Sequence, residues 1–320
     1  MSRNVDTVEH TPFPSFFVVG AAKAGTTTLY HYLSNHPEVF IPSKVKETNF
    51  FALEGRPADF TDVGSINYNK NSVHDEQAYA KLFESGSGKL CGEVCPLYLY
   101  SPMAAQAIAR RVPDAKIIIL LRDPAERAFS AYRHMQAYGS EKAKCFEDAL
   151  SMEDQHIADN WQFNSHYIAS SRYRQQVGRY MDAFPPENVL VIDFADIKER
   201  LDETLQEVQL FLGLSPIAIA ADAKGRNKTV VISNPILRNF LVNKRFGARA
   251  IRKVIPSRYR GAIREWLIGL WREEPERMSS ETHRKILEDL LEDIEGLELL
   301  LGRTFQGWSS HDIKQGGGIT

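Results

Sequence analysis

Short, mostly apolar runs alternate along the chain with segments whose apolar residues recur every three or four positions. The runs at 16–19 (FFVV), 116–121 (KIIILL) and 189–194 (VLVIDF) have the length of a strand that is buried on both faces. After the first two runs, apolar positions at helical spacing predict two helices. One of these helices contains Leu29, Tyr30 and Leu33, and the other covers 125–135.

Four more segments have the spacing of amphipathic helices, and each ends before a residue that stops a helix. They are 103–112 before Pro113, 173–184 before Pro185, 201–212 before Gly213, and a single last helix over 286–301 before Gly302. Strands that alternate with helices predict an α/β fold, in which a central parallel sheet is flanked by helices on both faces. Such sheets bind ligands at the carboxyl ends of their strands, so a site is expected in the loops that follow the strands.

The composition is that of an ordinary globular protein, and the net charge bears on whether the protein binds nucleic acid. Of the 320 residues, 43% are hydrophobic and 25% are charged, and the net charge of −2 argues against a nucleic-acid partner. No apolar run reaches the ~18 residues of a membrane span. The polar segment 1–14 lacks the apolar core of a signal peptide and is expected to be flexible, as is the glycine-containing tail 311–320.

The cysteines indicate a reducing compartment. The chain has three, an odd and small number that gives no disulfide framework. Cys91 and Cys95 lack the histidine or cysteine partners of a zinc site. We therefore expect a cytoplasmic protein that needs no metal.

The segment after the first predicted strand has the pattern of a phosphate-binding loop. Gly20 and Gly25 enclose four residues, and Thr26 opens the predicted helix. Glycines at this spacing let successive N–H groups turn inward, and the helix N-terminus adds partial positive charge. Nucleoside triphosphatases have a lysine directly after the second glycine, whereas here the lysine is Lys23, inside the loop. Lys23 therefore suits a ligand whose reacting group lies next to its first phosphate. A kinase and a plain strand–turn–helix without a ligand are the alternatives.

The segment KAGTTTLYHYLSNHP, which starts at Lys23, resembles the 5′-phosphosulfate loop of sulfotransferases that use 3′-phosphoadenosine-5′-phosphosulfate (PAPS). Its style is closest to the heparan-sulfate sulfotransferases and their bacterial relatives. The resemblance implies PAPS as donor, 3′-phosphoadenosine-5′-phosphate (PAP) as product, and a single domain over 15–310 with the fold of P-loop nucleotide kinases. It continues through VKETNFF (45–51), LLRDPAERAFSAY (120–132), FLGL (211–214), KGR (224–226) and the ending over 297–308.

The resemblance also assigns residues to the nucleotide. Arg122 ends the second strand and Ser130 lies about two turns into the next helix, and together they resemble the family's 3′-phosphate site. The alternative for Arg122 is a surface pair with Asp123 or Glu126, and for the later basic loop it is an exposed turn. The nucleotide-binding residues implied are Lys23, Ala24, Gly25, Thr26, Thr27, Thr28, Arg122, Ser130, Lys224, Gly225, Arg226 and Asn227.

Glu47 matches the glutamate that serves as general base in the heparan-type members. Direct sulfuryl transfer requires the acceptor to lose a proton, which a carboxylate within hydrogen-bond reach can take. Histidine does this in many members that act on small molecules, so His31 and His36 are rivals. A surface ion pair with Lys46 is the alternative for Glu47 that involves no catalysis. Lys23 is expected to stabilise the negative charge that builds up on the leaving phosphate.

Two further residues are candidates near the reacting groups. Lys46 is placed to add to the same charge stabilisation as Lys23. Glu93 follows a short predicted strand, at a place where the family often has residues that face the acceptor.

A basic stretch in the second half of the chain has several interpretations. Residues 223–264 contain lysines and arginines with apolar residues between them, but no acidic residue. A basic amphipathic helix over 236–264 could lie on an anionic membrane. It could also cover an anionic acceptor, or be a solvated helix with one face toward the core.

The sequence thus predicts an enzyme that transfers a sulfuryl group from PAPS to a hydroxyl or amine of a carbohydrate, lipid or small molecule. The predicted mechanism is in-line displacement with Glu47 as general base. The alternatives are a nucleotide or small-molecule kinase on the same scaffold, and a non-catalytic protein that binds anions or membranes.

Overall fold

A computed structural model describes residues 13–53, 56–218 and 277–308. The chain divides into two compact units. Unit 1 comprises Met1–Ala58, Asn69–Arg122 and Arg174–Ala223, and unit 2 comprises Asp59–Tyr68, Asp123–Tyr173 and Lys224–Thr320. The predicted domain limits at 15 and 310 stay predictions.

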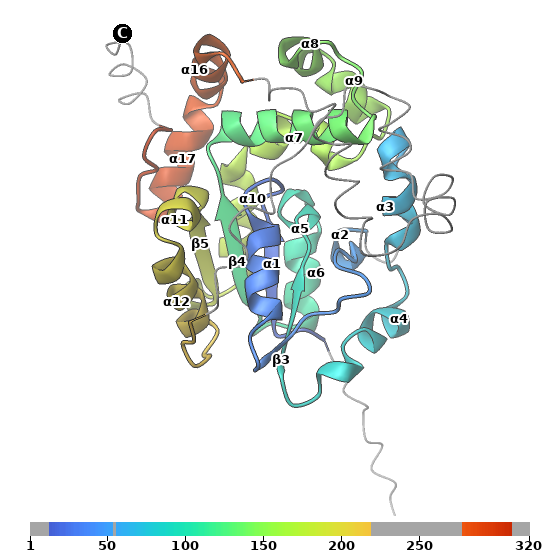
Figure 1. Ribbon diagram of the computed structural model, residues 1–320, viewed down its shortest axis with the longest axis vertical. Coiled ribbons are helices and arrows are strands. Elements are labelled where there is room, and N and C mark those ends of the chain that lie inside the picture. The colour runs from blue at the N-terminus through green and yellow to red at the C-terminus, as the bar shows by residue number, and fades with distance from the viewer. Residues whose placement is uncertain (1–12, 54–55, 219–276, 309–320) are drawn as a thin grey trace, which may run out of the picture. The chain divides into compact units, whose positions relative to one another are not determined.

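Unit 1 is built on a five-stranded parallel sheet (Figure 1). Its strands lie in the order β2-β3-β1-β4-β5, and every neighbouring pair is parallel. From β1 the chain goes first to one side of the sheet and only later, after β3, to the other, so its direction switches at β1. Ligands bind at the carboxyl end of such a switch point. The strands are β1 (Phe16–Gly20), β2 (Val39–Phe40), β3 (Leu90–Val94), β4 (Lys116–Leu121) and β5 (Val189–Asp193).

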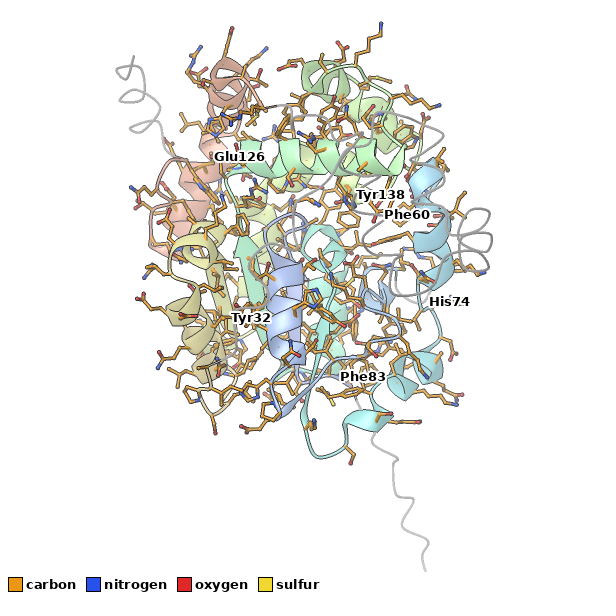
Figure 2. The ribbon with its side chains drawn as sticks, in the orientation of Figure 1. Tyr32, Phe60, His74, Phe83, Glu126 and Tyr138 are labelled. Atoms are coloured by element: carbon orange, nitrogen blue, oxygen red, sulfur yellow. The ribbon has the colours of Figure 1, made fainter. Side chains whose placement is uncertain are left out.

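Helices flank this sheet, and the predicted α/β fold is confirmed. All five residues of β1 are buried, as are five of the six in β4, because successive side chains point to opposite faces and both faces are covered. In Figure 2, Tyr32 lies on α1 and Phe83 follows α4, and both side chains are almost fully buried. The helices of this unit are α1 (Thr26–Ser34), α2 (Phe50–Leu53), α4 (Glu76–Lys81), α5 (Leu97–Tyr100), α6 (Ala104–Arg111), α10 (Tyr173–Ala183, from Arg174 on), α11 (Phe194–Glu199) and α12 (Leu201–Phe211).

Unit 2 is helical in its described residues, and α7 (Pro124–Tyr138) is its longest helix. Asp123 caps α7 by accepting a hydrogen bond from the Glu126 N–H at 2.8 Å. The same carboxylate lies 3.0 Å from Nε2 of His283 on α16, so α16 is joined to the start of α7. The other helices are α8 (Phe146–Ser151), α9 (Glu153–Ala158), α16 (Ser280–Asp289) and α17 (Leu291–Leu301). Helix α3 (Ile66–Asn71) runs from unit 2 into unit 1.

The prediction of one last helix over 286–301 is wrong. The segment forms two helices, α16 and α17, which are separated at Leu290, where φ is −105° and ψ is 7°. The apolar spacing continues across Leu290, so the periodicity alone does not reveal a break of one residue. The other strands and helices predicted within the described residues are confirmed within one to three residues.

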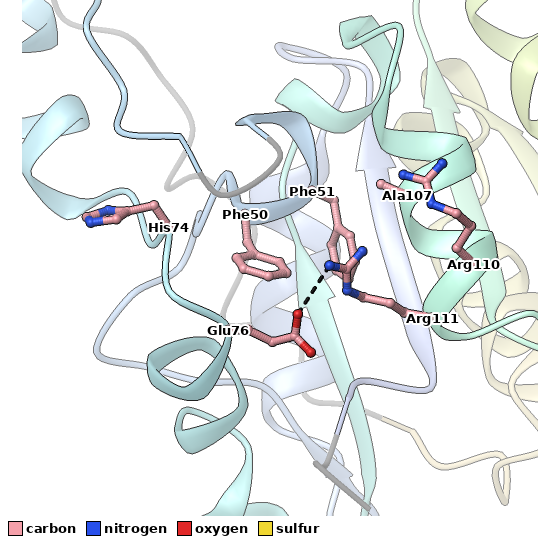
Figure 3. A pocket seen from close by; sticks show the side chains of 7 residues that line it. All are labelled: Phe50, Phe51, His74, Glu76, Ala107, Arg110 and Arg111. Atoms are coloured by element: carbon pink, nitrogen blue, oxygen red, sulfur yellow. Dashed lines mark hydrogen bonds and ion pairs between the residues drawn. The ribbon is translucent and has the colours of Figure 1, made fainter.

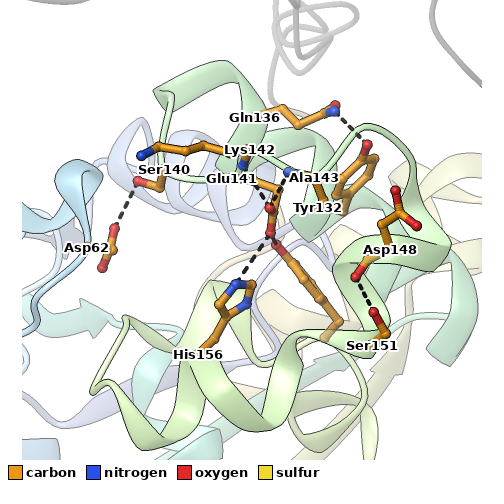
Figure 4. A network of polar contacts seen from close by, with 11 residues as sticks. Asp62, Tyr132, Gln136, Ser140, Glu141, Lys142, Ala143, Asp148, Ser151 and His156 are labelled. Atoms are coloured by element: carbon orange, nitrogen blue, oxygen red, sulfur yellow. Dashed lines mark hydrogen bonds and ion pairs between the residues drawn. The ribbon is translucent and has the colours of Figure 1, made fainter.

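A buried polar network holds the loop after α7 (Figure 4). One oxygen of Glu141 accepts the N–H groups of Lys142 and Ala143 at 2.7 Å, and the other accepts the Tyr167 hydroxyl at 2.7 Å. Next to it, the His156 ring stacks on Trp161 with 4.0 Å between the centroids. The buried Glu141 carboxylate thus binds the backbone of the loop after α7 on one side and the Tyr167 hydroxyl on the other.

His166, in the same unit, makes stability depend on pH. Burial lowers its pKa from 6.5 to about 4. Between these two values the unfolded chain binds more protons than the folded one. The free energy of unfolding therefore falls as the pH drops from 6.5 to about 4. One such group contributes at most about 1.4 kcal/mol per pH unit.

We expect His166→Asn, which keeps a polar side chain but does not titrate, to lose stability less steeply than the wild type over this window. Thermal unfolding at a series of pH values measures the two slopes. His74→Asn is the matched control, because His74 is exposed, and it should follow the wild type. Identical slopes for the wild type and His166→Asn would assign the pH dependence to other groups.

Candidate active site

The turn between β1 and α1 has the geometry of a phosphate-binding loop. Gly20, Lys23 and Gly25 have φ values of +150°, +71° and +94°, which turn the backbone back on itself. Helix α1 begins at Thr26, and its N-cap residue is Gly25, which has no side chain to cap the helix. The N-terminus of α1 therefore lies just beyond the carboxyl end of β1, the arrangement found in anion sites at helix N-termini.

Both glycines are also required by close packing. A Cβ at Gly25 would lie 2.8 Å from two ring carbons of Phe194, the first residue of α11. A Cβ at Gly20 would lie 2.6 Å from Cβ of Leu99, on α5. The loop is thus pressed between α11 and α5, which fixes its conformation without a ligand.

Arg122 fastens the same loop from the end of β4. Its Nη1 donates to the carbonyl of Lys23 at 3.2 Å, and its guanidinium carbon lies 5.1 Å from the centroid of the Phe194 ring. The structure therefore places Arg122 beside the loop, as expected for a residue at the end of that strand. Ser130 lies on α7 in unit 2, so its pairing with Arg122 stays a prediction.

The late basic loop 224–227 and the stretch 236–264 lie outside the described residues. Their roles in closing over the nucleotide and in contacting a membrane stay predictions.

Lys46 joins the loop to the candidate base. Its Nζ donates to Oγ1 of Thr27 at 3.0 Å and lies 3.3 Å from Oε1 of Glu47. The ammonium group also lies 5.5 Å from the centroid of the Tyr30 ring. The side chains of Lys46 and Glu47 are 28% and 31% exposed, so solvent and an acceptor can reach them. The Glu47–Lys46 ion pair exists, but it is not an isolated surface pair, because Lys46 also binds the first turn of α1.

The two rival histidines have other surroundings. His36 is 2% exposed, and its Nδ1 accepts the Glu38 N–H at 3.2 Å while Nε2 donates to the carbonyl of Ser215 at 3.1 Å. With both ring nitrogens engaged, His36 holds the turn after α1. His31 lies in the last turn of α1, at the end away from the loop, with its ring 5.3 Å from that of Tyr30.

Glu93 lies within β3 rather than after a strand, which corrects its predicted position. Its side chain is 1% exposed and accepts hydroxyl groups from Thr48, Tyr79 and Tyr98. Burial raises the pKa of Glu93, against the effect of these hydrogen bonds. Sequence reasoning missed these three partners. Thr48 has a local signal, since it follows Glu47, whereas Tyr79 comes from α4 and is brought close only by the fold.

A separate cavity is lined by residues of α2 and α6 and of the start of α4 (Figure 3). Its volume is about 320 Å³, and Arg111 on its rim pairs with Glu76 at 3.1 Å. Arg111 ends α6, which leads to the start of β4, so the cavity lies toward the amino ends of the strands and contains no residue predicted to act in transfer. It is lined by Phe50, Phe51, His74, Glu76, Ala107, Arg110 and Arg111.

The described residues contain neither a metal-binding cluster nor a helix suited to cross a membrane. In 13–53, 56–218 and 277–308, no group of three or more His, Cys, Asp and Glu side chains is arranged to hold a metal ion. None of the helices in these ranges has the length and apolar character needed to cross a bilayer.

The comparisons with known proteins agree with this geometry. The model of the sulfotransferase family matches residues 14–217. The solved structure of a sulfotransferase from Alicyclobacillus acidocaldarius is 30% identical, with a TM-score of 0.72, over 93% of this chain and 99% of that one.

Two curated relatives are similar over most of this chain but extend well beyond it. The human bifunctional heparan sulfate N-deacetylase/N-sulfotransferase 2 is 27% identical over 209 residues, which are 63% of this chain and 22% of the relative. The membrane-associated sulfotransferase kil1 of Dictyostelium discoideum is 25% identical over 314 residues, covering 72% of this chain and 62% of the relative. The chain therefore spans only part of the length of these relatives.

The family match includes the phosphate loop, Glu47 and Arg122, and it agrees with the resemblance found in the motifs. With the parallel sheet, the loop after β1 and this match in hand, the chain belongs to the sulfotransferase family.

Proposed function

We propose that this sulfotransferase moves a sulfuryl group from PAPS to a hydroxyl or amine of a carbohydrate, lipid or small-molecule acceptor, with Glu47 as general base. The observation that supports this most is the position of Lys46, 3.0 Å from Thr27 in the loop and 3.3 Å from Glu47. One side chain thereby links the donor loop to a partly exposed carboxylate. Transfer requires these two parts of the site to meet at one reacting atom.

The donor is recognised through its negative charges. The first-turn N–H groups of α1 and the Lys23 ammonium bind the 5′-phosphosulfate, since a helix N-terminus favours anions. Arg122 and Ser130 bind the 3′-phosphate, together with residues 224–227. PAPS is a substrate in this scheme, and no metal takes part.

The chemical step is an in-line displacement at sulfur. The acceptor oxygen or nitrogen forms a bond to sulfur while the bond between sulfur and the bridging oxygen of the 5′-phosphate breaks. The electron pair of the broken bond stays on the phosphate, which leaves as PAP, and the acceptor's proton passes to the Glu47 carboxylate. Lys23 and Lys46 stabilise the charge on the departing oxygen.

The names of the relatives give limited guidance on the acceptor. One relative is named for N-sulfation of heparan sulfate, which supports an amine or hydroxyl of a carbohydrate as one acceptor class. Another is named as membrane-associated, which supports a peripheral contact through 236–264.

The direct test is a mass-spectrometric screen of acceptors incubated with PAPS and without Mg²⁺. We expect one acceptor class to gain a single sulfuryl group, and PAP but not ATP–Mg²⁺ to bind in titrations.

Lys23→Ala should lose most turnover at an unchanged melting temperature, because Lys23 faces the ligand in this scheme. Turnover of Lys23→Ala within about threefold of wild type, under roughly 1 kcal/mol, would remove Lys23 from the donor site. Phosphate transfer from ATP that requires Mg²⁺ would favour the kinase alternative.

Arg122 tests the 3′-phosphate site. Loss of a hydrogen bond between charged groups costs about 1.5–3 kcal/mol, or roughly 10- to 100-fold in affinity. We expect Arg122→Ala to weaken the binding of PAP by such a factor. The binding of adenosine 5′-phosphate, which lacks the 3′-phosphate, should weaken far less. Arg122→Lys keeps the positive charge without the planar guanidinium, so its affinity for PAP should lie between those of the wild type and Arg122→Ala. If both nucleotides weaken equally in Arg122→Ala, Arg122 only fastens the loop through the Lys23 carbonyl.

Glu47 tests the mechanism. Glu47→Gln keeps size and polarity but cannot take a proton, so kcat should fall about 100-fold or more while the Kd for PAP stays nearly constant. The loss should be larger for an alcohol acceptor than for a phenol, which ionises more easily. His31→Gln is the control and should keep normal kcat. If Glu47 served only in a surface pair, stability would change by at most ~1 kcal/mol and kcat would be close to normal.

A further inference from the structure

The buried carboxylate of Glu93 is bound by hydroxyl groups. Oε1 accepts the Thr48 hydroxyl at 2.5 Å and the Tyr98 hydroxyl at 2.9 Å, and Oε2 accepts the Tyr79 hydroxyl at 2.6 Å. The Tyr98 hydroxyl also lies 3.0 Å from Oε2. Glu93 is 1% exposed, and Tyr79 and Tyr98 are fully buried, so solvent does not compete for these bonds.

The direction of these bonds requires an acceptor at both oxygens. An ionised carboxylate accepts at both, whereas an amide presents an NH₂ group at one of them. Whichever way an amide is turned, its NH₂ meets either the Thr48 or the Tyr79 hydroxyl. At least one of these bonds must then reverse or break. The geometry at Glu93 is therefore specific for a carboxylate and not only for a polar side chain of its size.

One of the three donors, Thr48, is the neighbour of the proposed base Glu47 in the chain. Thr48 directly follows Glu47 and is 1% exposed. Its Oγ1 also accepts the N–H of Phe50 at 3.2 Å, and the Tyr98 hydroxyl accepts the N–H of Phe51 at 3.4 Å. The backbone from Glu47 into α2 is thus held through hydroxyls that Glu93 itself binds.

Asn49 and Phe50, which follow Thr48, are also held by side-chain contacts. Asn49 has a φ of +59°, which is uncommon for a residue other than glycine. Its amide nitrogen donates to Ser72 Oγ at 2.8 Å, and its amide oxygen accepts from Cys95 Sγ at 3.2 Å. The Phe50 ring stacks on Tyr79 with 4.3 Å between the centroids. The turn after Glu47 is therefore held by side-chain contacts to the end of β3 and to α4.

We infer that Glu93 is a positioning residue for catalysis: through Thr48 it fixes the backbone that presents Glu47 to the acceptor. This inference rests on the proposed function, because it assumes that Glu47 is the base. Glu93 itself is enclosed and touches no reacting atom. A displacement of a catalytic group by about 1 Å costs on the order of 100-fold in rate, so a distant anchor of this kind matters for turnover.

The test is a double-mutant cycle between Glu93→Gln and Glu47→Gln. We expect Glu93→Gln alone to lower kcat about 10- to 100-fold, with little change in the Kd for PAP. If Glu93 acts through Glu47, adding Glu93→Gln to Glu47→Gln should cause little further loss, because residues that act as a unit are not additive. Equal loss of kcat in both backgrounds would overturn the inference.

Two matched variants separate positioning from stability. Thr48→Val removes the one hydroxyl that leads to Glu47, and it should reproduce the kcat loss of Glu93→Gln. Tyr167→Phe is the control, because it removes an equally buried hydroxyl from another carboxylate, that of Glu141 in unit 2, and it should lower the melting temperature while kcat stays within about twofold of the wild type. Equal kcat losses in these two variants would show that Glu93 only stabilises the fold.

Hydrogen exchange gives a readout that does not depend on turnover. The amides of Phe50 and Phe51 should exchange faster in Glu93→Gln and Thr48→Val than in the wild type, whereas those of the loop 23–28 should be unchanged. Unchanged exchange at 50 and 51 would overturn the inference even if kcat falls. If exchange is faster in the two variants but the wild-type protein transfers no sulfuryl group from PAPS, the proposed function has failed, whereas the anchoring of this backbone by Glu93 is supported.

Discussion

The rest of the site depends on the turn from β1 into α1. A parallel strand that is buried on both faces ends at a switch point of the sheet, and a helix with glycine at its N-cap begins six residues after Gly20. This brings partial positive charge to the carboxyl edge of the sheet before any side chain is considered. The ends of β4 and β5 then hold the turn through Arg122 and Phe194, and the segment after β2 reaches it through Lys46. The sheet order decides which strand ends can do this, since β4 is the neighbour of both β1 and β5.

Two glutamates near this edge have opposite surroundings, which support the different roles proposed for them. Glu47 is partly exposed and lies beside an ammonium group, so its carboxylate is accessible and its charge is balanced. Glu93 is enclosed and bound by hydroxyls, and burial raises its pKa, so the hydrogen bonds are needed to stabilise its charge. The proposed general base must meet the acceptor molecule, and of these two glutamates only Glu47 is exposed enough to do so. An enclosed carboxylate with three donors is instead suited to fixing the atoms that bind it.

The sequence predicts most of the fold because its dominant signals are local. Continuous apolar runs identify β1, β4 and β5, and helix-stopping residues such as Pro113 and Gly213 limit the helices. The same kind of signal fails at Leu290, where the apolar spacing continues through a break in the backbone. It is also weak for β2, which has two residues, and for β3, where Gly92 and Glu93 interrupt the apolar pattern. Gly92 has a long-range cause, because a Cβ there would lie 1.9 Å from the Phe16 ring on β1.

The candidate site divides in the same way between local and long-range information. The loop from Gly20 to Thr28 and the pair Lys46–Glu47 are contiguous in sequence, so their residue types and spacing predict them. The partners of Glu93 come from three separate segments, and nothing near Tyr79 in the sequence indicates that its hydroxyl meets a carboxylate 14 positions away. A glutamate in an apolar strand is a local conflict, since a charged side chain there loses its hydration. Such a conflict indicates that partners must exist, but only the fold identifies them. Here it identifies Thr48, and so connects the buried core of the sheet to the residue next to Glu47.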